Sequence, residues 1–114
     1  MISHIVLFKP KPTIGHAERV AIVEHLKAAI ARCPTVRRCR VGRRVVHGLP
    51  GYERLMFEDF RFSLILDFDD VEGLKAYLQN PAHAGIGGLF TSAASASLAY
   101  DYELEDLANA SQLL

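Results

Sequence analysis

Residues 60–83, FRFSLILDFDDVEGLKAYLQNPAH, hold the signals that decide the fold. From residue 60 to residue 68 every second side chain is Phe or Leu. This alternation is typical of a strand with one face in the core. Asp69 or Asp70 then supplies a side-chain oxygen that can cap a helix, and the helix is expected to continue through Leu78. The stretch therefore predicts a strand that is followed at once by a helix.

A corner at Asn80 and Pro81 ends this helix. Proline disfavours helical geometry in the residue before it, and it suits the first position of a new helix. A second helix is therefore expected to begin at Pro81 or Ala82, with His83 in its first turn. Tyr77 and His83 then lie on either side of a stiff corner, where a phenol and an imidazole can converge on one cavity.

The rest of the chain predicts three more strands and one long helix. The strand segments are rich in β-branched and aromatic residues. The helix carries an apolar stripe at helical spacing. The strands are expected at Ile2–Lys9, Val36–Val46 and Ser97–Leu104, and the helix from Thr13 or Gly15 to about Arg32. The stripe consists of Val20, Val23, Leu26, Ala29, Ile30 and Cys33.

Residues 47–59 are expected to form a loop, because Gly48, Pro50 and Gly51 interrupt any regular pattern. Three side chains in this segment are apolar for a loop, and we expect them to cap a pocket or an interface. They are Tyr52, Met56 and Phe57.

The predicted order β-α-β-β-α-β is the ferredoxin-like arrangement of the α+β class. Its four-stranded antiparallel sheet carries helices on one face only. The predicted strands have apolar residues on both faces, so the face without helices must also be covered. A second copy of the chain can cover it by two-fold pairing of the same surface, and we therefore expect a homodimer.

The length of 114 residues fits one domain. We expect the domain at residues 1–104 and a short tail at residues 105–114, which is free or reaches a partner. The 13 basic and 13 acidic residues balance, so bulk charge does not attract nucleic acid or an anionic membrane. Five arginines fall between residues 37 and 44. They form either the solvated side of a strand, which is the favoured interpretation, or an anion-binding patch.

The two cysteines, Cys33 and Cys39, lack the CxxC spacing of redox or zinc sites. We expect both thiols to be reduced and structural, which fits a cytoplasmic protein. No signal peptide is expected, since the N-terminus lacks a basic start, an apolar run and a cleavage site. No apolar run has the length of a membrane span.

Five stretches of the chain form an ordered pattern. They are Ile2-Ser3-His4-Ile5-Val6-Leu7-Phe8-Lys9, Val41-Gly42-Arg43, Asp69-Asp70-Val71-Glu72, Asn80-Pro81-Ala82-His83 and Tyr100-Asp101-Tyr102. Taken together, the region from Met1 to about Leu104 resembles the stress-responsive A/B barrel (Dabb) family. The resemblance implies a dimeric α+β barrel built from two ferredoxin-like chains.

The best understood activity in that family is similar to that of the plant olivetolic acid cyclase. This activity needs no cofactor and closes a linear polyketide by an aldol step. The resemblance implies that Tyr77 and His83 correspond to its catalytic tyrosine and histidine, and His4 to a pocket histidine. This chain departs from the cyclase at two positions. Phe62 replaces a second pocket histidine, and Asn80 replaces the histidine before the corner proline.

The residue types suit proton chemistry. A histidine can take up or release a proton near neutral pH, and a phenol can donate to the oxygen of a developing enolate. The hypothesis is that His83 is a general base, Tyr77 an oxyanion donor and His4 an orienting group. The predicted apolar cavity around them is lined by Phe8, Phe62, Leu64, Ile86 and Phe90.

Other interpretations of the same residues remain open. A histidine in the first turn of a helix is often a hydrogen-bonding core residue, and a tyrosine spaced from leucines is often core as well. No cofactor or metal is expected, because no carboxylate accompanies the histidines at metal-site spacing. The glycines of residues 85–88 do not follow a strand, so they do not indicate a nucleotide site.

Three functions follow from these alternatives. The first is a cofactor-independent cyclase, isomerase or lyase that acts on a small carbonyl or aromatic compound. The second is a module that binds a hydrophobic small molecule without converting it. The third is a stress-related dimeric scaffold with a filled interior.

Overall fold

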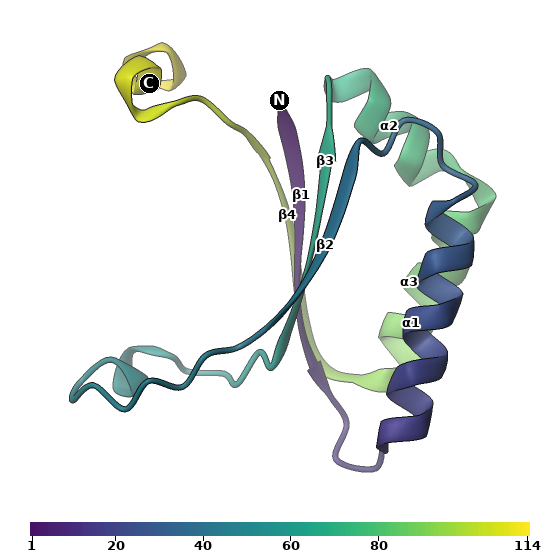
Figure 1. Cartoon of the computed structure of the whole chain (residues 1–114), viewed down its shortest axis with the longest axis vertical. Helices are drawn as coiled ribbons and strands as arrows, with labels where there is room; N and C mark the ends of the chain where they lie inside the picture. Colours follow the sequence, from purple (N-terminus) through teal and green to yellow (C-terminus); the bar gives the residue numbers. More distant parts are fainter.

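The computed structural model describes residues 1–114 and consists of a four-stranded antiparallel sheet with helices on one face (Figure 1). The strand order is β2-β3-β1-β4, so the predicted ferredoxin-like arrangement is confirmed. The strands are β1 (Ile2–Pro10), β2 (Arg38–Arg43), β3 (Phe62–Phe68) and β4 (Ala94–Glu103). The helices are α1 (His16–Ile30), α2 (Val71–Gln79) and α3 (Pro81–Ala93), and short 3₁₀ helices occupy Glu53–Leu55 and Leu107–Leu113.

The second strand is shorter than the predicted range Val36–Val46. β2 pairs with β3 only from Arg38 to Arg43. A strand ends where the neighbouring strand no longer pairs with it. β3 begins at Phe62, the residue opposite Arg43, so β2 ends there. Val45, which was expected in the strand, instead lies exposed in the connection that leads away from the sheet.

The last strand begins earlier than the predicted Ser97. β4 starts at Ala94, directly after the final residue of α3, with no loop between them. The junction is held by a hydrogen bond in which the Lys11 amide donates to the Ala93 carbonyl at 2.8 Å. The end of α3 therefore fixes where β4 enters the sheet.

The register of the ladders decides which side chains reach the helices. In β1, every second residue from Ile2 to Phe8 pairs with a residue of β3 from Phe68 back to Phe62. These positions supply much of the buried core, which burial of apolar surface stabilises. The core cluster consists of Ile2, Leu26, Ala29, Cys33, Leu64, Leu66, Phe68, Leu74, Tyr77 and Ile86.

The apolar stripe of α1 is only partly buried. Leu26, Ala29 and Cys33 are buried, as predicted, but Val20 and Val23 remain 45% and 38% exposed. The reason is that the first half of α1 stands over an open cavity, described below, while its second half packs on the core. The prediction of one continuous buried stripe is therefore wrong for the first half of the helix.

Of the two predicted caps, Asp69 and Asp70, it is Asp70 that caps α2. Its side chain accepts a hydrogen bond from the Gly73 amide at 2.7 Å, and the carbonyl of Gly73 accepts from Thr35 Oγ1 at 2.8 Å. The start of α2 is thereby tied to the segment that leads into β2, which keeps the helix at a fixed position over the sheet.

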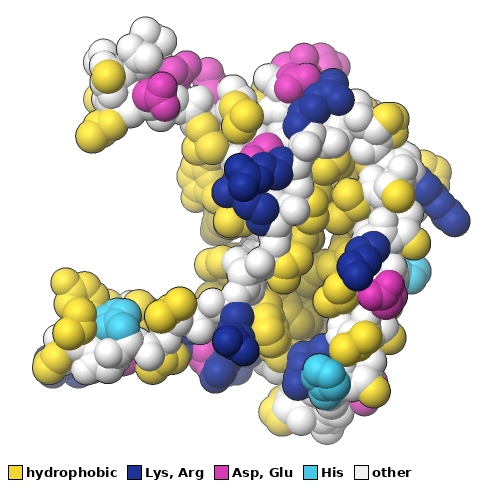
Figure 2. Space-filling model, viewed as in Figure 1, with side chains coloured by type: hydrophobic (Ala, Val, Ile, Leu, Met, Phe, Trp, Pro, Cys, Tyr) yellow, Lys and Arg dark blue, Asp and Glu magenta, His cyan; other side chains and the backbone are white.

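Two segments extend away from the face that carries no helices (Figure 1). They are the β2–β3 connection, residues 44–61, and the tail, residues 105–114. Their apolar side chains are largely exposed, with Phe57 at 98% and Leu107 at 90%. Figure 2 shows apolar side chains gathered in the recess between the two segments. Apolar exposure of this extent is typical of a surface that binds a partner.

Leu66 gives a direct test of the core. Its side chain is fully buried in β3, so Leu66→Ala is expected to lower the free energy of unfolding by about 2–5 kcal/mol through lost transfer energy and a cavity. Urea denaturation measures the change. Val71→Ala, at an exposed position of α2, is the control and should shift stability by no more than about 0.5 kcal/mol. Equal effects of the two variants would contradict this assignment of the core.

Candidate active site

The corner between α2 and α3 forms as predicted and places His83 in the first turn of α3. Asn80 Oδ1 accepts a hydrogen bond from the Ala82 amide at 2.9 Å, which caps α3. Asn80 Nδ2 donates to the Arg32 carbonyl at 3.2 Å, so the corner is also tied to the end of α1. The Asn80 carbonyl accepts from the His83 amide at 2.9 Å. Asn80 therefore fixes the backbone on which His83 stands.

The three residues predicted to be catalytic lie together. The rings of Tyr77 and His83 are 4.9 Å apart between centroids, and the rings of His4 and Tyr77 are 5.8 Å apart. Both pairs have edge-to-face geometry, which favours the contact. The residues come from β1, α2 and α3, so the fold unites groups that are distant in the sequence.

A fourth residue completes this cluster, and sequence reasoning did not find it. His4 Nδ1 lies 2.6 Å from Asp101 Oδ1, because β1 and β4 pair in a register that sets His4 opposite Asp101. A carboxylate only accepts hydrogen bonds, so the imidazole N–H donates and the ring is held in one orientation. The only sequence signal was an acidic residue on the opposite face of β4 from Tyr100 and Tyr102. Using that signal requires the register, which the sequence does not give.

The environment of Tyr77 keeps its phenol protonated. The side chain is 1% exposed. Burial, together with the smaller effect of the charge that Cys33 and Cys39 can carry, raises the pKa of Tyr77 to about 12. A desolvated phenolate is disfavoured, so the hydroxyl remains a hydrogen-bond donor throughout the physiological pH range.

The environment of His83 keeps its imidazole neutral. Burial lowers the pKa of His83, and the positive charge that His4 can carry lowers it further. A hydrogen bond to the Leu78 carbonyl acts in the opposite direction. In a neutral imidazole one ring nitrogen carries the proton and the other keeps its lone pair. A neutral imidazole and a protonated phenol therefore lie next to each other at the corner, with ring centroids 4.9 Å apart.

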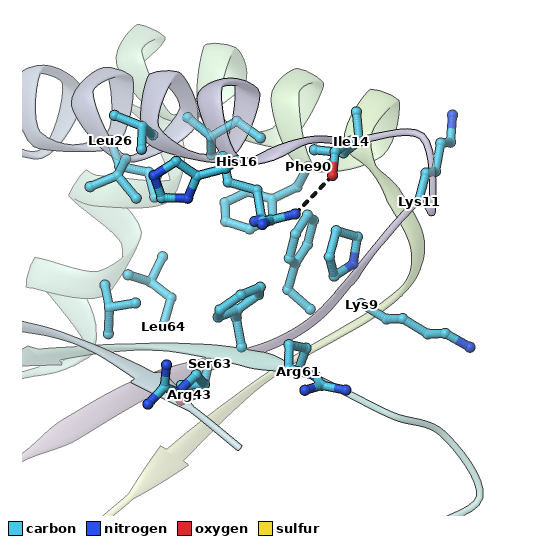
Figure 3. A pocket seen from close by; sticks show the side chains of 18 of the residues that line it. Lys9, Lys11, Ile14, His16, Leu26, Arg43, Arg61, Ser63, Leu64 and Phe90 are labelled. Atoms are coloured by element: carbon cyan, nitrogen blue, oxygen red, sulfur yellow. Dashed lines mark hydrogen bonds between the residues drawn. The ribbon is translucent and has the colours of Figure 1, made fainter. Parts of the chain in front are cut away.

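A cavity of about 790 Å³ lies between α1 and the sheet (Figure 3). Its walls combine side chains of β1, β2, β3, α1 and α3. In Figure 3, Leu26 and His16 lie on the helix side and Ser63 and Leu64 on the sheet side. Four of the five predicted pocket residues line it, namely Phe8, Phe62, Leu64 and Phe90.

The three residues predicted to be catalytic lie outside this cavity. None of His4, Tyr77 and His83 is among the lining residues. Ile86, the fifth predicted pocket residue, is 3% exposed and packs in the core instead. Along α3, His83, Ile86 and Phe90 follow one another at about one turn, so Ile86 lies between the aromatic cluster and the cavity. The sequence predicted one site, and the structure has two neighbouring regions on the same helix.

Metal-ligand clusters, membrane-spanning helices and disulfides are absent from the structure. No three His, Cys, Asp or Glu side chains gather closely enough to hold a metal ion. None of the helices combines the length and the apolar run that crossing a bilayer requires. Both thiols are free, with Cys33 buried and Cys39 exposed.

Sequence comparison decides the family. The profile of the Stress responsive A/B Barrel Domain family matches residues 2–104. The chain belongs to this family. No curated protein sequence matches this A/B barrel chain.

Several solved structures share the fold of this A/B barrel protein. A hydroxynitrile lyase from Passiflora edulis has a TM-score of 0.79 and 13% identity, with 92% of this chain and 94% of that chain covered. A dimeric ferredoxin-like protein of unknown function from Thermobifida fusca has a TM-score of 0.71 and 20% identity, with 90% of each chain covered. SnoaB, a cofactor-independent oxygenase from Streptomyces nogalater, has a TM-score of 0.68 and 14% identity, with 92% and 93% covered. At these identities the similarity shows the fold alone.

The protonation of His83 predicts a pH dependence of stability. Its pKa in the folded protein lies below the unfolded value of about 6.5. Between these two values the unfolded chain binds more protons, so stability falls as pH decreases through this window. His83→Asn should make the decrease between about pH 7 and pH 5 less steep, as measured by urea denaturation at a series of pH values.

The matched control for this measurement is His25→Asn, which replaces an exposed histidine of α1. This variant should keep the pH dependence of the unmodified protein. If His83→Asn and the unmodified protein had the same slope, His83 would not be held neutral by its surroundings.

Proposed function

We propose that this A/B barrel protein is a cofactor-independent enzyme, a cyclase, isomerase or lyase, that acts on a small carbonyl or aromatic compound. One observation carries the proposal: His83, Tyr77, His4 and Asp101 form a contiguous cluster from four separate elements. Its protonation states are those that proton transfer next to a carbonyl requires. The protein groups alone can perform such a step.

Each residue of the cluster has a distinct role. The free ring nitrogen of neutral His83 removes a proton from the carbon next to a carbonyl group. The hydroxyl of Tyr77 donates a hydrogen bond to the oxygen on which negative charge then develops. His4 is oriented by Asp101 and lies next to Tyr77. Its imidazole is therefore directed toward the same oxygen as the Tyr77 hydroxyl. His83 returns the proton at the end of the step.

Access to the cluster requires motion of one apolar layer. Leu64 lines the cavity and also packs in the core cluster with Tyr77 and Ile86. A substrate held in the cavity therefore reaches Tyr77 when Ile86 rotates away from the core. Glycines at positions 85, 87 and 88 lower the helix propensity around Ile86 and favour local opening of α3.

A second candidate function is a module that binds a hydrophobic small molecule without converting it. The separation of the cavity from His83 favours this alternative. The cavity has the volume of drug-sized ligand sites, and Phe8 and Phe90 of its lining meet edge to face with centroids 4.9 Å apart. In this case the aromatic cluster would stabilise the corner between α2 and α3.

The proposed assembly is a homodimer formed by the face of the sheet that carries no helices. The matched structures from Thermobifida fusca and two other bacteria are described as dimeric. On this face Ile5 and Tyr100 pair across the β1–β4 ladder, and Tyr100 is 58% exposed. Two such faces can cover each other, and the projecting connection and tail can extend along the partner.

Turnover tests the proposed chemistry without knowledge of the natural substrate. The assay follows deuterium exchange at the carbons next to the carbonyl of 2-octanone in heavy water by NMR. Because the base is lost, His83→Gln should lower the exchange rate by roughly 10²–10⁴-fold. Because the oxyanion donor is lost, Tyr77→Phe should lower it by roughly 10–10³-fold.

The control for turnover is His25→Gln, at an exposed position outside the cluster, which should exchange at the rate of the unmodified protein. Unchanged exchange in His83→Gln would remove His83 as the base. If the unmodified protein bound the ketone but exchanged no protons in any form, the binding module would be the correct function.

The dimer has its own test. Tyr100→Glu places a charge in the centre of the proposed interface, where desolvation of an unpaired carboxylate is unfavourable. The unmodified protein should have twice the protomer mass by light scattering, and Tyr100→Glu should have the protomer mass. Val71→Glu, on the exposed side of α2, should remain dimeric. A monomeric unmodified protein would contradict the proposal.

A further inference from the structure

The cavity between α1 and the sheet is surrounded by positive charge. Its lining contains five cationic residues and one carboxylate, although the whole chain has a net charge of zero. The cations are Lys9, Lys11, Arg19, Arg43 and Arg61, and the carboxylate is Asp59. We infer that this cavity binds an amphipathic anion, with its apolar part between α1 and the sheet and its carboxylate or phosphate group at Arg19.

Two of the five cations are neutralised within the chain. Lys9 Nζ pairs with Glu58 at 3.0 Å, and Arg61 pairs with Asp59 at 2.6 Å. Asp59 also accepts from Arg44 at 2.8 Å, and these two arginines lower the pKa of its carboxyl group. The one carboxylate of the lining is therefore ionised and already occupied. It cannot neutralise the remaining cations.

Arg19 is the cation best placed to meet a ligand. It stands on α1 next to Val20 and one turn before Val23, which also line the cavity. Its Nη1 donates to the Ile14 carbonyl at 2.8 Å, the bond drawn as a dashed line in Figure 3. This bond holds the guanidinium beside the cavity and leaves its other N–H groups available. None of the ion pairs of the protein includes Arg19.

Two further cations have no ionic partner in the protein, Lys11 and Arg43. They come from the β1–α1 connection and from the end of β2, so they approach the opening from different elements. Both are exposed, in contrast to partly buried Arg19. Exposed cations attract an anion over a distance, whereas a partly desolvated guanidinium binds it in two parallel hydrogen bonds.

The apolar walls select the rest of the ligand. Phe8, Phe62 and Phe90 are aromatic, and α1 adds aliphatic side chains opposite the sheet. Such walls contribute little binding free energy for a fully polar anion, since removing the anion from water is unfavourable without many hydrogen-bond donors. An uncharged apolar molecule would leave Arg19 unpaired. An acid with an apolar chain or ring satisfies both parts of the cavity.

This inference rests on the proposed function only in taking the cavity as the place where the substrate binds. It adds a substrate class to the chemistry proposed above: a carbonyl compound that also carries an acid group. Binding at Arg19 and proton transfer at His83 use different residues, so the two can be tested separately.

Isothermal titration calorimetry with matched octyl compounds tests the inference. The probes are octanoate, octyl phosphate, octanol and octylamine, which share a chain and differ in the head group. The better of the two anions should bind roughly tenfold or more tightly than octanol, and octylamine should bind most weakly. The relative affinity of octanoate and octyl phosphate identifies the preferred acid group. Added salt should weaken the binding of the anions but not that of octanol.

Substitutions of the cavity cations test whether these residues cause the preference for anions over octanol. Arg19→Gln should remove the roughly tenfold preference and leave octanol binding unchanged. Arg32→Gln, two residues after the end of α1, is the matched control and should keep the preference, as should His83→Gln. If Arg19→Gln does not fold, the double variant of Lys11→Gln and Arg43→Gln should weaken anion binding severalfold at unchanged octanol affinity.

Two results would overturn the inference: octanol binding as tightly as both anions, or an intact preference in Arg19→Gln or, where that variant does not fold, in the double variant. Either result would leave the His83 assay untouched. If the unmodified protein preferred anions but exchanged no deuterium, only the proposed enzymatic activity would be contradicted.

Discussion

The pairing of β1 with both of its neighbours is the constraint on which the molecule depends. β1 occupies the centre of the sheet between β3 and β4, so its register sets both ladders at once. With this register His4 faces Asp101 on one side and Leu66 on the other. A slip by one residue would move every side chain of β1 to the opposite face. The core, the aromatic cluster and the floor of the cavity would be lost together.

Local chemistry made most of the elements predictable from the sequence. Alternation of apolar residues identified β1 and β3, and the proline corner identified the break between α2 and α3 within one residue. These signals act between neighbours in the chain. The contact of Tyr77 with His83 was predictable for the same reason, because both flank one corner.

Features that depend on distant pairing were not predictable in the same way. Asp101 reaches His4 only through the ladder between the first and last strands. The length of β2 is set by where β3 begins. The exposure of Val20 follows from a cavity whose walls come from five elements. No pattern within a short window contains this information, so the sequence predicted one site where the structure has two adjacent regions.

The direct passage from α3 into β4 has a consequence for how this chain can change over evolution. Because no loop separates Ala93 from Ala94, an inserted or deleted residue in α3 has no flexible segment that could absorb it. It would turn the end of the helix by about 100° and reverse the side of the sheet on which Asp101 emerges. The number of residues in α3 is therefore constrained more tightly than the identity of its exposed side chains.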